Sequence, residues 1–172
     1  MGRFKKNNFL RLMANNGPVI LLLISVLNEF DFNYLGLNYF SFDFPFILIF
    51  YWSLKRTESL GYGFIFISGL INDVVLGLPI GISSLSYLFI CGFAAYLKNI
   101  TLRPNIIKDW IFFLFTIVFI KSLVHLLLSL FFSFKLDYNV LIINLLITFF
   151  MYYFLSLLFE LYSKMVFRGQ ND

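Results

Sequence analysis

The chain consists of long apolar runs separated by short polar or basic stretches. These runs show neither the two-residue alternation of a half-buried strand nor the 3.6-residue alternation of a surface helix, and uninterrupted apolar segments are typical of helices that cross a membrane. We therefore predict an all-α integral membrane protein, folded as a single membrane domain over residues 1–172 with a basic segment at 1–16. The six predicted transmembrane spans cover residues 10–28, 44–54, 59–75, 82–97, 110–132 and 140–162.

Composition agrees with this pattern. Of the 172 residues, 60% are hydrophobic and 13% are charged, whereas a soluble domain has about 25% charged residues. The basic N-terminus lacks a small-residue cleavage site, so we interpret the apolar run after it as a retained first span and not as a signal peptide. Cys91 is the single cysteine, and no disulfide can form within the chain.

The positive charges predict the orientation of the spans, because cytoplasmic loops carry an excess of Lys and Arg. If the N-terminus is cytoplasmic, eleven of the thirteen cations fall on that side, Lys121 lies within the membrane and only Lys135 lies outside. The basic residues of 1–16 form either a plain positive-inside anchor, which we favour, or an interfacial helix on anionic membrane lipid. We expect both termini in the cytoplasm, and the external loops then contain Glu29, Asp31, Asp43 and Asp137.

The second span is short for a bilayer, and it ends at Lys55 and Arg56. Pro45 lies in its first turn, where the missing N–H does little harm. Tyr51 and Trp52 come just before the two cations. This order predicts that both aromatic residues lie at the membrane interface, where Tyr and Trp are enriched.

Residues 69–81 contain the least expected polar residues of the chain. Asn72 and Asp73 interrupt an apolar run, and an ionisable residue within a span costs about 2.5–3.5 kcal/mol on insertion scales, so it is normally turned inward and partnered. The sequence Gly-Leu-Pro-Ile-Gly follows at 77–81. Its glycines and proline predict the turn between the third and fourth spans.

Three polar residues are predicted to lie at one depth, and a fourth shares a helix face with one of them. At a rise of about 1.5 Å per residue, Asp73 lies roughly 21 Å, and Lys121 roughly 20 Å, from the cytoplasmic end of its span. Asn144 lies roughly 9 Å inside the outer surface of an about 30 Å core, which is the same layer. His125 follows Lys121 by four residues and therefore shares its helix face.

Three interpretations of this polar set are open. The first is a proton or substrate path through Asp73, Lys121 and His125. The second is an Asp73–Lys121 ion pair, with Asn144 and His125 as hydrogen-bonding residues between helices, and we favour it because no second acid is predicted at this depth. In the third, Lys121 reaches outward without a partner. Asp73 then caps the turn at Gly77.

No motif for catalysis or cofactor binding is present in the sequence. With one His and one Cys, the chain has no cluster with the ligand spacing of a zinc site. No serine lies in a nucleophile elbow, and no phosphate-binding loop occurs. We expect no catalytic residue, no cofactor, no metal and no nucleic-acid partner. Gly61, Gly63 and Gly69 are weak candidates for a close approach between helices.

Three sequence elements, in this order, resemble the rod shape-determining MreD family. They are a second span that ends in Tyr-Trp and basic residues, a Gly-Leu-x-x-Asp in the third span, and a Gly-x-Pro-x-Gly turn. The residues that carry them are Trp52, Gly69, Asp73, Gly77, Pro79 and Gly81. The rest of the chain agrees with the family in length and span count. It departs from the family at Asp43-Phe44, where Arg-Pro is common, and at Thr57-Glu58, where a proline is common.

The resemblance implies a non-enzymatic scaffold in the bacterial inner membrane, part of the cell-elongation machinery that controls cell shape and lateral peptidoglycan synthesis. It implies association with an MreC-like protein and, indirectly, with MreB and the RodA–penicillin-binding-protein synthase. The family's fold is similar to the S-components of energy-coupling-factor transporters, which also have six transmembrane helices. That similarity supplies the alternative function, a substrate-binding membrane subunit of a small-molecule (vitamin-type) transporter.

Overall fold

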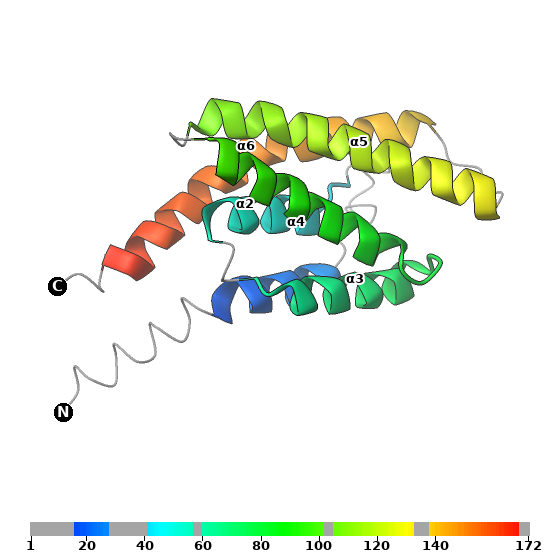
Figure 1. Cartoon of the computed structure of the whole chain (residues 1–172), viewed down its shortest axis with the longest axis horizontal. Coiled ribbons are helices and arrows are strands. Elements are labelled where there is room, and N and C mark those ends of the chain that lie inside the picture. Colours follow the sequence, from blue (N-terminus) through cyan, green and yellow to red (C-terminus); the bar gives the residue numbers. More distant parts are fainter. Residues whose placement is uncertain (1–15, 28–40, 57–59, 102–104, 133–137, 169–172) are drawn as a thin grey trace.

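The computed structural model describes residues 16–27, 41–56, 60–101, 105–132 and 138–168. These residues form six helices, and the predicted all-α class is confirmed (Figure 1). The helices are Asn16–Leu27, α2 (Phe44–Lys55), α3 (Tyr62–Leu76), α4 (Ile82–Ile100), α5 (Ile106–Phe132) and α6 (Tyr138–Arg168).

The helix bounds follow from local sequence signals. α2 begins at Phe44 with a proline in its first turn, and α4 begins at Ile82 after Gly81. α3 begins at Tyr62, three residues later than the predicted third span, because Gly61 has an extended backbone and serves as the N-cap. α5 and α6 start earlier than the predicted spans. Residues 10–15 of the predicted first span lie outside the described residues.

α2 lies at the centre of the bundle. Nine of its twelve residues are buried, and it packs against α4 and α6. Phe50 extends this packing, since its ring lies 5.1 Å from that of Phe113 in α5 and 5.6 Å from that of Tyr152 in α6. Tyr51 and Trp52 do not form the lipid-facing aromatic belt that their position before two cations predicted. Both are buried, at 4% and 1% exposure, because α2 is surrounded by other helices and presents no side to lipid.

The remaining helices are arranged around this centre. α4 packs against α3 on one side and α5 on the other, and α5 packs against α6. The turn between α3 and α4 lies at the same end of the bundle as the C-terminal end of α5, at the right in Figure 1, and the C-terminal end of α6 lies at the opposite end. Asn16–Leu27 contacts the C-terminal half of α6, where Gly17 fits beside the hydroxyl of Tyr162.

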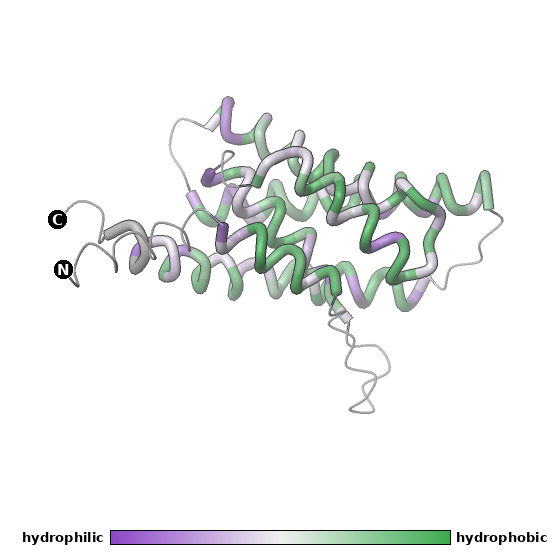
Figure 2. The backbone as a smooth tube through the Cα atoms, turned by 90° about the horizontal axis from the view of Figure 1, so that it is seen from below, coloured by the Kyte–Doolittle hydropathy of each residue, from purple (hydrophilic) through white to green (hydrophobic). Residues whose placement is uncertain are grey.

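Apolar side chains cover the outside of the bundle, and polar side chains are buried within it. Hydrophobic positions predominate along the helices in Figure 2. Phe115 and Phe131 are about 70% exposed, at 68% and 74%, whereas Ser68, Asp73 and Thr148 are fully buried. A water-soluble surface rarely carries apolar patches of this extent, but lipid-facing helices do.

Two described helices are long and apolar enough to cross a membrane, Ile106–Phe132 and Tyr138–Lys164. Asn16–Leu27, Phe44–Lys55 and Tyr62–Leu76 are apolar but shorter. The twelve residues of α2 rise only about 18 Å, roughly 12 Å less than the hydrocarbon core of a bilayer. The first residue of α2 therefore lies well inside the bundle, which decides the position of Asp43.

Candidate functional site

Asp73 joins the end of α3 to the start of α4. Its carboxylate accepts two backbone hydrogen bonds, from the N–H of Gly81 at 2.7 Å and from the N–H of Ser83 at 2.8 Å. These N–H groups belong to the first turn of α4, which has no partner for them within the helix. The side chain of Asp73 is fully buried, and the positive end of the helix dipole stabilises its charge.

The turn itself depends on two glycines with positive φ. Gly77 ends α3 at φ 64°, and its N–H donates to the carbonyl of Asp73. The next N–H, of Leu78, donates to the same carbonyl at 2.9 Å. Gly81 precedes α4 at φ 106°. Pro79 lies between them, and its carbonyl accepts the N–H of Ile82. The predicted turn at 77–81 is therefore present.

α3 and α4 approach each other closely next to this turn. A Cβ on Gly69 would lie 2.3 Å from the Cα of Ser84, closer than any side chain allows. Ser84 donates its hydroxyl to the carbonyl of Phe66, and the amide nitrogen of Asn72 donates to the hydroxyl of Ser83 at 3.0 Å. Of the three glycines predicted as weak candidates for close packing, Gly69 is the one that meets the neighbouring backbone.

A second polar cluster lies between α2, α5 and α6. The Lys121 ammonium is 2.5 Å from the Asp43 carboxylate and donates to the side-chain carbonyl of Asn144 at 2.7 Å. The amide nitrogen of Asn144 donates to the backbone carbonyl and the hydroxyl of Ser41. The N–H of Asp43 donates to the hydroxyl of Thr148. This cluster attaches the start of α2 to both long helices.

The predicted Asp73–Lys121 ion pair is wrong. The backbone of the α3–α4 turn satisfies Asp73, and the partner of Lys121 is Asp43. The sequence alone predicts Asp43 in an external loop, next to a second span that is short for a bilayer. Since α2 is only twelve residues long, Asp43 reaches the depth of Lys121. Of the sites predicted at this depth, Lys121 and Asn144 are in direct contact.

His125 lies one turn above Lys121 on α5. Its ring is 5.2 Å from that of Tyr138, and its Nδ1 is buried with no hydrogen-bond partner among the described residues. The structure therefore does not bring His125 into the hydrogen-bonded cluster, and the predicted path through Asp73, Lys121 and His125 is not formed by direct contacts among these side chains.

A second ion pair, which the sequence did not predict, lies at the other end of α2. Lys55 Nζ lies 3.4 Å from the carboxylate of Asp109, which is only 5% exposed. Asp43 and Lys55 are twelve residues apart, and so are Asp109 and Lys121. Along each segment the acid comes first and the lysine twelve residues later. Because α2 and α5 run antiparallel, each acid lies opposite the lysine of the other helix, and both ion pairs can form. That spacing was the available signal for Asp43.

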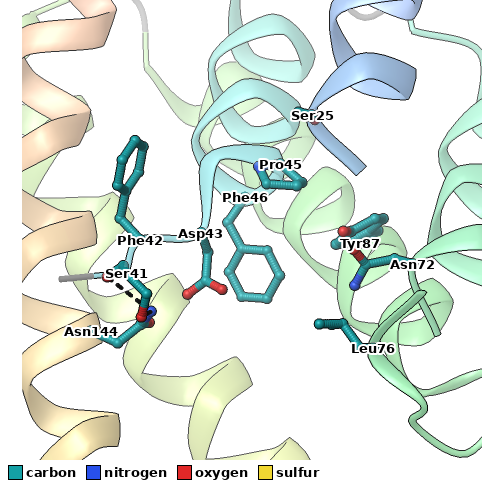
Figure 3. Close-up of a pocket in the computed structure, with 10 residues that line it drawn as sticks. All are labelled: Ser25, Ser41, Phe42, Asp43, Pro45, Phe46, Asn72, Leu76, Tyr87 and Asn144. Atoms are coloured by element: carbon teal, nitrogen blue, oxygen red, sulfur yellow. Dashed lines mark hydrogen bonds between the residues drawn. The ribbon is translucent and has the colours of Figure 1, made fainter. Parts of the chain in front are cut away.

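Two adjoining cavities lie at the α3–α4 turn end of the bundle. The smaller, about 240 Å³, is shown in Figure 3, where Asp43 and Asn144 lie across from Asn72 and Leu76. The larger, about 450 Å³, shares these four residues and extends along α5 past Lys121 and His125 to Leu128. The Asp43–Lys121 cluster therefore borders open space, whereas Asp73 lines neither cavity.

An apolar exterior, a polar interior and two helices long enough to cross a bilayer define a helical membrane protein. A family model described as rod shape-determining protein MreD matches residues 11–166 of the 172-residue chain. The chain therefore belongs to the MreD family, which is part of the MreBCD machinery of cell shape, and the resemblance found in the sequence is confirmed. No curated protein and no solved structure gives a significant match.

Proposed function

We propose that this chain is a non-enzymatic scaffold of the cell-elongation machinery in the bacterial inner membrane. In this proposal it controls lateral peptidoglycan synthesis through partners, with an MreC-like protein bound directly and MreB and the RodA–penicillin-binding-protein synthase reached through it. The observation that carries the proposal is the family match over residues 11–166, since a role in rod shape determination belongs to that family.

The contacts that three polar residues make between helices support a scaffold. Asp73, Asp109 and Asn144 each connect two or more helices. A residue in such a role fixes the relative positions of helices, and hence the shape of the apolar surface that a partner in the membrane would meet.

The proposal includes six membrane crossings with both termini in the cytoplasm. The short α2 crosses as part of the bundle and not alone, because other helices surround it. Reporter fusions at Arg56, Arg103 and the C-terminus are expected to be cytoplasmic, and fusions near Asp31, Pro79 and Asp137 periplasmic. A periplasmic C-terminus would mean an odd number of crossings and would contradict this topology.

The function is tested by depletion and complementation in the host. Depleted cells are expected to become round, and the tagged protein is expected to retain an MreC-like protein from membrane extracts. Complementation with Gly63→Ala should restore rods, because no atom lies within 4 Å of the added methyl group, whereas Gly69→Ala should not, because its methyl group meets the backbone of α4. Depleted cells that keep their rod shape would overturn the proposal.

One observation favours a second candidate, the small-molecule transporter subunit with an S-component-like fold. A cavity of about 450 Å³ falls within the roughly 300–1,000 Å³ range of small-molecule sites. Loss of uptake of a vitamin-type compound in depleted cells that remain rods would favour this function over the scaffold. Rounding with unchanged uptake would favour the scaffold.

A further inference from the structure

We propose that the larger cavity at the start of α2 binds a neutral amphiphile, a molecule with hydroxyl groups at one end and an apolar body. The floor of this cavity is formed by Asp43, Lys121 and Asn144, and its volume of about 450 Å³ suits a small ligand. The inference does not rest on the scaffold function, since binding can be measured on the isolated protein.

The cavity exists because α2 begins only at Phe44, partway along the bundle. α5 continues for eleven residues beyond Lys121, a rise of about 16 Å, whereas α2 has no helical turn beyond Phe44. Side chains from the described parts of α3, α4, α5 and α6 line the space on this side of α2. The cavity therefore follows from the unequal lengths of the helices.

The charges that face the cavity cancel each other. Asp43 and Lys121 form an ion pair, and the other described lining residues, apart from His125, cannot ionise. A ligand with a single net charge would bring an uncompensated charge into a partly buried site, which is costly. A neutral ligand leaves the ion pair intact, and this argues for a neutral polar group over a carboxylate or an amine.

Unused hydrogen-bonding capacity faces the same space. The Lys121 ammonium has three N–H donors, and Asn144 accepts one of them. The ammonium also forms the ion pair with Asp43 Oδ2, which accepts no hydrogen bond from the described residues. His125 Nδ1 has no hydrogen-bond partner among the described residues. The amide oxygen of Asn72 accepts no hydrogen bond from them, although its nitrogen donates to Ser83. A hydroxyl group both donates and accepts hydrogen bonds. Two neighbouring hydroxyl groups on a ligand therefore match a free N–H of Lys121 and the free acceptor atoms of His125 and Asn72.

The apolar part of the cavity lies farther out. Leu128 is seven residues beyond Lys121 on α5, about 10 Å closer to the end of the helix. Val140 and Leu141, near the start of α6, line the same outer part, together with Leu76 at the end of α3. Because the floor is polar and the outer part apolar, we place the hydroxyl end of the ligand at Lys121 and its apolar body beside Leu128.

Photo-crosslinking tests this placement directly. The probe is a monoacylglycerol with a diazirine on its acyl chain, added to the full chain in phosphatidylcholine nanodiscs and followed by mass spectrometry of the adducts. Adducts are expected near Leu128 on α5 and near Val140 on α6. Unlabelled monooctanoylglycerol at roughly ten times its Kd should reduce them about tenfold. Octanoate is charged and glycerol has no apolar body, so neither of them should reduce the adducts.

Two matched variants supply the control. Leu141→Trp fills the cavity and should abolish the adducts, whereas Ile142→Trp, one residue away and 54% exposed on the outside, should leave them unchanged. Adducts spread along lipid-facing positions such as Phe115, or equal loss in both variants, would overturn the proposal. If octanoate reduced the adducts as much as monooctanoylglycerol does, the proposal that the ligand is neutral would be overturned. If Leu141→Trp does not fold, the test rests on the wild-type protein: adducts near Leu128 and Val140 support the proposal, and adducts spread over lipid-facing positions overturn it.

Discussion

Two aspartates at the α3–α4 turn end of the bundle solve the same physical problem in different ways. Asp73 is fully buried, and two backbone N–H groups at the start of α4 accommodate its charge. The side chain of Asp43 is 29% exposed, borders a cavity and pairs with Lys121. A buried acid therefore needs no lysine when a helix N-terminus lies against it.

The difference separates a structural region from a candidate binding region. At the α3–α4 turn, backbone N–H groups satisfy the carboxylate of Asp73, so a change there should affect folding. The Asp43–Lys121 cluster keeps free hydrogen-bonding capacity beside open space, so a change there should affect stability less. The three predictions that follow test this contrast, beginning with the largest expected loss.

Asp73→Ala is expected to destabilise the protein most. It removes a carboxylate that accepts two buried backbone N–H groups, and hydrogen bonds to charged groups contribute about 1.5–3 kcal/mol each, so the loss is roughly 3–6 kcal/mol. Asp73→Asn keeps one acceptor oxygen and should lose less. The free energy of unfolding in mixed micelles, measured by titration with a denaturing detergent, gives both values. A loss below about 1 kcal/mol for Asp73→Ala would contradict the capping role.

Gly69→Ala should cost about 1–3 kcal/mol or more, because the new methyl group meets backbone atoms of Ser84 that cannot move independently of α4. Gly63→Ala, on the same helix and with nothing within 4 Å of the new methyl group, is the matched control. It should stabilise α3 by up to about 1 kcal/mol through helix propensity. Equal thermal midpoints for the two variants in detergent would show that the close approach is absent.

Asn144→Leu is expected to have a smaller effect, about 1–3 kcal/mol, because it removes the acceptor for Lys121 and the donor to Ser41 in a cluster that is only partly buried. Asn139→Leu makes the same change at an exposed position of α6 and should cost almost nothing. The same titration measures both variants. A loss for Asn144→Leu as large as that for Asp73→Ala would erase the difference between the two regions.

The all-helical fold and the α3–α4 turn could be predicted from the sequence, because apolar runs and the glycines at 77 and 81 act locally. The partner of Lys121 could not be predicted in the same way. Depth estimates depended on the assumption that each span is long enough to cross the whole bilayer by itself, and the twelve residues of α2 are too few for that. The burial of Trp52 could not be predicted for a related reason, since composition does not reveal which helix is central.

Two double-mutant cycles test the central claim most directly, that Lys121 is coupled to Asp43 and not to Asp73. The measured quantity is the free energy of unfolding of Lys121→Met, Asp43→Ala, Asp73→Ala and the two double variants, each containing Lys121→Met. No bond joins Asp73 to Lys121 among the described residues, so their losses should add within about 0.5 kcal/mol, whereas Asp43 and Lys121 should show a coupling of roughly 1 kcal/mol or more. Coupling of Lys121 to Asp73, with additivity for Asp43, would contradict the account.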